Sequence, residues 1–115
     1  SPDHDPTLPL SAASLMMSFR TMFDASRAKG LALTGTILVG SETFQVEVRG
    51  GKLRANRGAP DLSDFTFAAP AAPPIAAAIY GKVPFAELAP MGLEPAGDLT
   101  QAAAFIDLFH LPPKA

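Results

Sequence analysis

The alternation of apolar and polar side chains is clearest in the middle of the chain, between residues 43 and 58. Every second residue of 43–49 is apolar, which is the period of a strand with one buried face. Gly50 and Gly51 follow, and both can take positive φ without a Cβ clash, as a type I′ turn requires. Alternation resumes in 52–56. The pattern predicts a two-stranded hairpin, which needs neighbouring elements to bury its apolar face.

The same periodicities predict the remaining elements. Strands are expected at 31–40 and 64–68, with a short edge strand within 91–97, and helices are expected from Ser11, over 74–80, over 84–88 and from Asp98. Because four strands follow one another through short links, we expect an antiparallel meander. The fold class is α+β: a four- to five-stranded antiparallel sheet covered on one face by helices, with a long N-terminal helix and a C-terminal helix.

Composition limits the class of protein. The 115 residues suffice for one domain, and 48% hydrophobic against 17% charged residues argues against disorder. A net charge of −2 gives no overall electrostatic attraction to nucleic acid or an anionic membrane, and no apolar run is long enough to insert stably in a bilayer. The absence of cysteine fits a reducing compartment, so we expect a cytoplasmic location.

The first ten residues carry three prolines, Pro2, Pro6 and Pro9, and are interpreted as a Pro-rich linker, 1–10, before a domain at 11–115. The chain does not start with Met. Either a piece of a longer protein or a processed N-terminus would account for this start.

Residues suited to catalysis or metal binding are few. His4 and His110 have no metal-ligand partner at helical spacing, and no serine has a histidine partner in the sequence. We therefore expect no catalytic residues, no metal and no cofactor. A basic cluster, Arg49, Lys52, Arg54 and Arg57, surrounds the hairpin turn and is either a contact for an anionic headgroup or carboxylate or, as the pattern favours, a solvated sheet face.

The order of these segments resembles the sterol carrier protein-2-like (SCP2) domain. The matching stretches are Phe44-Gln-Val-Glu-Val-Arg-Gly-Gly-Lys-Leu53, Asp64-Phe-Thr-Phe67, the helix from Ile75 to Gly81, Gly97-Asp98, and Leu108-Phe-His-Leu-Pro112. Pro95 departs from the regular strand that this family often has there, which puts the pairing of the edge strand in question.

The start of the chain is similar to a narrower group. Leu8 to Met16 and Arg20 to Phe23 resemble the linker and first helix of the C-terminal domain in some bacterial winged-helix regulators of the HxlR type. The resemblance implies that DNA would be contacted only through an N-terminal domain that this chain lacks.

The SCP2 resemblance implies a non-enzymatic fold that holds an apolar molecule, such as a fatty acid, between sheet and helices. From apolar parity and the family layout, the candidate ligand-binding residues are Met16, Phe19, Met22, Phe23, Ile37, Phe44, Val46, Phe67, Ile79, Phe105 and Phe109. We expect a ligand-sensing domain of a transcriptional regulator. One alternative is a dimerisation module, which would form a homodimer and whose core is filled by its own side chains. The other is a free-standing lipid carrier.

Overall fold

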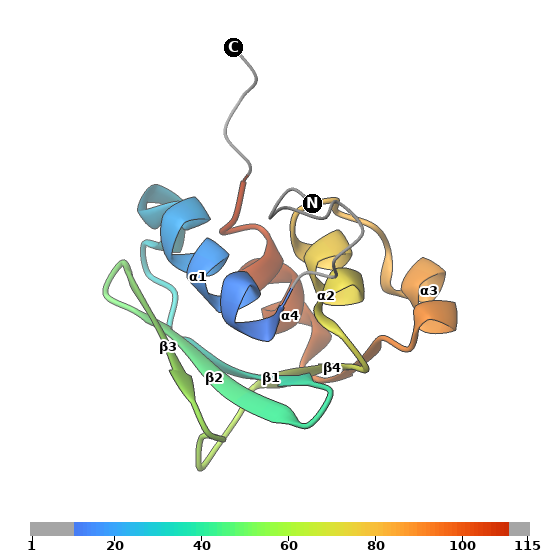
Figure 1. The fold of residues 1–115 in the computed structure, drawn as a ribbon. Coiled ribbons are helices and arrows are strands. Elements are labelled where there is room, and N and C mark those ends of the chain that lie inside the picture. Colours follow the sequence, from blue (N-terminus) through green and yellow to red (C-terminus); the bar gives the residue numbers. More distant parts are fainter. Residues whose placement is uncertain (1–10, 111–115) are drawn as a thin grey trace, which may run out of the picture.

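The structure, a computed structural model, describes residues 11–110. Its elements are, in chain order, α1 (Ala12–Met22), the 3-10 helix η1 (Ala25–Ala28), β1 (Leu33–Val39), β2 (Glu42–Arg49), β3 (Lys52–Arg57), β4 (Phe65–Ala69), α2 (Ala72–Ile79), α3 (Phe85–Leu88), the 3-10 helix η2 (Ala89–Met91), β5 (Glu94–Gly97) and α4 (Leu99–Ile106). The strands form one sheet, and α1, α2 and α4 lie over the same face of it (Figure 1). The expected α+β class, with helices on one face of the sheet, is confirmed.

The predicted hairpin forms the outer half of the sheet. β2 and β3 pair antiparallel, with Arg49 opposite Lys52 at the turn. Gly50 and Gly51 have φ of 57° and 75°. Only glycine adopts this conformation at two successive positions without steric cost, so the turn follows directly from the sequence.

The fourth strand corrects the predicted meander, because β4 runs parallel to β1 and the sheet order is β3-β2-β1-β4-β5. The chain leaves β3 and crosses to the far edge of β1 through residues 58–64, on the side of the sheet opposite the helices (Figure 1). Asp64 fixes the crossing, since its N–H donates to the Thr34 carbonyl at 2.7 Å and its carboxylate accepts from the Thr34 N–H at 2.8 Å. The Thr36 hydroxyl donates to that of Ser63 at 3.0 Å. These bonds hold the end of the link beside β1, directly before β4 begins.

The edge strand β5 forms despite its proline. Pro95 lies opposite Phe67 of β4, and β5 is the last strand of the sheet. An edge strand tolerates proline because one side of its backbone has no partner strand. The pairing that the sequence put in question is therefore present.

The end of α1 is joined to the end of α4. Phe23 and Phe109 form an isolated antiparallel bridge, and the Asp24 N–H donates to the Leu108 carbonyl at 2.7 Å. The His110 N–H returns a bond to the Met22 carbonyl at 3.3 Å. We call these contacts the 23/109 clasp. They close the helical layer over the sheet.

Helices α1 and α4 have the caps that the sequence predicts. The Ser11 hydroxyl accepts from the Ser14 N–H at 3.0 Å, and the Asp98 carboxylate accepts from the N–H groups of Thr100 and Gln101. Such bonds satisfy amides that have no partner within the helix.

Candidate functional site

The sequence-predicted ligand residues come together, but they do so as core. Nine of the eleven are buried, and Met22 and Phe23 are partly buried against the same cluster. The ring of Phe105 lies 5.7 Å from that of Phe19 and 4.8 Å from that of Phe109, between centroids. The ring centroid of Phe67 lies 6.5 Å from that of Phe105. Rings at these separations are in packing contact.

Two of the predicted residues also border a surface hollow. Met16 and Phe44 line a volume of about 300 Å³ beside α1 and β3, together with polar groups that include Arg20 and Arg57. Met22 and Phe23, at the end of α1, are part of the 23/109 clasp. The assignment of the eleven residues to ligand contact stays a prediction.

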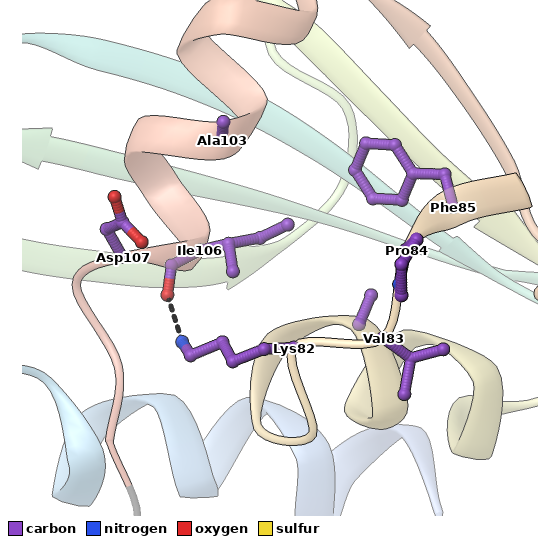
Figure 2. A pocket seen from close by; sticks show the side chains of 8 residues that line it. Lys82, Val83, Pro84, Phe85, Ala103, Ile106 and Asp107 are labelled. Carbon is purple, nitrogen blue, oxygen red and sulfur yellow. Dashed lines mark hydrogen bonds between the residues drawn. The ribbon is translucent and has the colours of Figure 1, made fainter. Parts of the chain in front are cut away.

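A hollow lined mainly by apolar residues lies elsewhere, between α4 and the link that joins α2 to α3. It holds about 360 Å³, and we call it the α4 hollow; its lining is Ala78, Lys82, Val83, Pro84, Phe85, Ala103, Ile106 and Asp107. Figure 2 shows the link on one side of the hollow and α4 on the other, with Lys82 reaching toward the end of the helix. A volume of this size is at the small end of known ligand pockets, which suits a short apolar molecule.

Lys82 is the polar group that shapes this hollow. Its ammonium donates to the carbonyl of Ile106 at 2.7 Å (Figure 2). It also donates to the carbonyl of Phe109 at 2.9 Å. These carbonyls lie at or just after the C-terminal end of α4, where a cation is favoured by the helix dipole. Partial burial lowers the pKa of Lys82, while the carboxylate of Asp107 acts in the opposite direction. Lys82 is also the one non-glycine residue in the described chain with positive φ, 55°. The link is therefore held in a costly conformation by its bonds to α4.

Phe85 separates the α4 hollow from the aromatic core. Its ring centroid lies 5.6 Å from that of Phe67, which in turn packs on Phe105. Phe85 is only half-buried, because its other side faces the hollow. It stands in a helix of four residues, Phe85–Leu88, that begins directly after Pro84. The ring of Phe85 therefore stands between the hollow and Phe67, one of the sequence-predicted residues.

The sequence analysis missed the residues of the α4 hollow. It selected apolar positions by their parity within strands and helices, and this criterion finds the core. The signal that would have helped is Val83-Pro84-Phe85, a run of apolar residues in a link between two helices, where polar residues are the norm.

Comparisons with known proteins identify the fold of the chain. No protein-family model and no curated protein matches the chain. Among solved structures, a UbiJ-SCP2 ubiquinone synthesis protein is similar at a TM-score of 0.64 and 18% identity, over 91% of this chain and 93% of that one. The fold is that of an SCP2-like domain. At this level of identity the likeness concerns the fold alone.

Part of a much larger enzyme has the same SCP2-like fold. The stereoselective inverting sec-alkylsulfatase Pisa1 from Pseudomonas sp. is similar at a TM-score of 0.71 and 15% identity, over 83% of this chain. Its S233Y F250G double mutant is similar at a TM-score of 0.73 and 18% identity, over 90% of this chain. This chain spans 16–17% of the length of those enzymes.

Residues 11–110 contain no helix long and apolar enough to cross a membrane. Within the same range, no group of three or more His, Asp or Glu side chains is placed to hold a metal ion.

Proposed function

We propose that this chain binds a small hydrophobic molecule without catalysing its conversion, and that the α4 hollow is where the molecule enters. The observation that carries the proposal is the half-buried ring of Phe85, with the hollow on one side and Phe67 of the aromatic core on the other. A ligand that moves this ring would gain apolar contact area in the core. The SCP2-like fold of the chain supports the same function.

The ligand fits the hollow through its apolar part. Val83, Pro84, Phe85 and Ile106 offer apolar walls, whereas Lys82 and Asp107 place opposite charges at the rim. Burying apolar area contributes about 25 cal/mol per Å², so a short acyl or alkyl chain would gain most of its affinity from these walls. Fatty acids and fatty alcohols of medium chain length are the compounds to test first.

A pair of tryptophan variants tests the hollow. Ala103 is exposed on α4 and lines the hollow, so Ala103→Trp should fill it and abolish binding. Ala86→Trp is the matched control, because Ala86 is an exposed alanine of α3 that does not line the hollow. Binding is read by native mass spectrometry with a panel of acids and alcohols. The proposal fails if neither the wild type nor Ala86→Trp binds any of them, or if Ala103→Trp binds as well as its control.

The finer part of the proposal is that the domain senses its ligand for a transcriptional regulator in the cytoplasm. The similarity of residues 8–16 and 20–23 to regulators of the HxlR type supports it. A ligand can shift DNA affinity only by binding one state of the regulator more tightly than another. The test is DNA binding by the full-length gene product with and without the hydrophobe. Equal affinity in both conditions, or a gene product without a DNA-binding domain, would reject the sensing role.

The filled core favours a second candidate, a dimerisation or spacer module. Phe19, Phe105 and Phe109 pack on one another with little room for a guest. Sedimentation of the isolated domain distinguishes the two: a concentration-dependent dimer that binds no hydrophobe supports the module, and a strict monomer argues against it.

A further inference from the structure

The β2–β3 hairpin carries a second hollow on the face of the sheet that the helices do not cover. Along β2 and β3 the side chains of Val46, Val48 and Ala55 are buried toward the helices, and the alternate positions point to the opposite face. Four of the latter, Glu47, Arg49, Lys52 and Arg54, line a hollow of about 320 Å³. Every side chain that lines it is charged.

This hollow has an excess of positive charge. Three cations and one carboxylate give it a net charge of +2, whereas the whole chain has −2. Glu47 is already engaged, since one of its oxygens lies 2.6 Å from Nε of Arg49. Within residues 11–110, neither Lys52 nor Arg54 has a carboxylate within 4.0 Å.

The strand register brings the cations together at a cost. Arg49 lies directly opposite Lys52, and Arg54 lies opposite Glu47 in the next pair on the same face. Like charges directly opposite each other destabilise an antiparallel pair. The two glycines of the turn hold the strands in this register. An anion held between the cations would remove the repulsion.

We propose that the hairpin hollow binds a compact tetrahedral dianion, phosphate or a phosphate monoester. The charge of −2 matches the excess, and four oxygens can accept from donors that approach from three side chains. Guanidinium groups pair with phosphate through two parallel hydrogen bonds, and lysine adds a point charge. A single carboxylate has one charge and two oxygens and satisfies the site less well. The site is independent of the α4 hollow, because it lies on the other face of the sheet.

The test is a titration of the ¹⁵N-labelled protein with sodium phosphate at constant ionic strength, followed by NMR. The amides of Gly50 and Gly51 report on the turn. We expect their shifts to saturate with phosphate and with glycerol 3-phosphate. Arg54→Gln should weaken the affinity about tenfold, as the loss of one charge-assisted contact implies.

Arg57→Gln is the matched control. Arg57 is on the same strand as Arg54, and its replacement by glutamine removes the same charge. Its side chain pairs with Glu42 at 2.9 Å and lies over the ring of Phe44, outside the hollow. Its affinity for phosphate should equal that of the wild type. Shifts that rise linearly without saturation overturn the proposal, and so does equal weakening in the two variants.

Vesicles of phosphatidylcholine with phosphatidic acid identify the source of the phosphate. Binding of free phosphate but not of vesicles supports a soluble phosphate ligand, and binding of both supports a lipid headgroup. Binding of vesicles without saturation by free phosphate overturns the compact site, because an extended charged surface would then be responsible.

Discussion

Gly35 offers the sharpest test of how β4 packs on β1. The two strands place Gly35 directly beside Phe65, and a Cβ built on Gly35 would come within 3.0 Å of three carbons of that ring. The ring has little room to move, because Phe67 and Phe105 lie 5.2 and 5.3 Å from it between centroids. We therefore expect Gly35→Ala to force the ring out of its place.

The size of the effect follows from two opposing contributions. Overpacking a core costs about 1–3 kcal/mol, and the close contact with a fully buried ring puts this site near the upper end. Replacing glycine by alanine also restricts the unfolded chain, which stabilises by about 0.4–1 kcal/mol where φ allows it. The net expectation for Gly35→Ala is a loss of about 2 kcal/mol in the free energy of unfolding, measured by urea denaturation followed by circular dichroism.

A double-mutant cycle with Phe65→Leu tests the cause. Leucine has no ring to collide with the new methyl group. The loss in the free energy of unfolding of the double variant should therefore be about 1 kcal/mol smaller than the sum of the losses of the two single variants. Simple additivity would refute the steric explanation. A Gly35→Ala variant as stable as the wild type would refute the packing of β4 on β1 as described.

Two further predictions concern single side chains. Asp98→Ala should cost about 1 kcal/mol by removing the cap from the amides of Thr100 and Gln101, whereas Asp98→Asn should cost much less; equal losses in urea denaturation would contradict a capping role. Tyr80 is the only tyrosine, and burial raises its pKa while the hydrogen bond between its hydroxyl and that of Ser18 opposes the rise. Its contribution to stability is thus complete below the ordinary pKa of tyrosine, about 10, and is lost as pH rises through the higher pKa of the folded state. Near-ultraviolet absorbance of the phenolate should show titration above the ordinary value, shifted further upward in Ser18→Ala; a shift downward would contradict the assignment.

Local chemistry made much of the fold predictable. The type I′ turn depends on two adjacent residues, Gly50 and Gly51, and the cap of α4 depends on Asp98 and the amides that follow it. Such features depend on a few residues that are neighbours in the sequence. The partner of β4 is not, because it depends on bonds between Asp64 and Thr34, which are thirty residues apart.

The site was harder to predict than the fold. Parity selects residues such as Phe19 and Phe105 because they face inward, and it does so whether the interior is filled or hollow. Leu99 shows a related limit, because it is an apolar residue at the start of α4 and yet the structure leaves it 49% exposed. Whether an inward position meets a cavity depends on the volumes of all its neighbours. No single segment of the sequence contains that information.

The 23/109 clasp has a consequence for synthesis on the ribosome. The segment that closes the helical layer, Leu108 to His110, comes at the end of the described chain, and its partners at the end of α1 are made more than eighty residues earlier. Until α4 has left the exit tunnel, the apolar parts of α1 and the sheet that α4 covers stay exposed, although α1 and α2 can already pack on the sheet. The nascent chain therefore exposes this apolar surface until residues 99–110 can pack on it. Any premature stop before Phe109 would release a product that chaperones and proteases recognise.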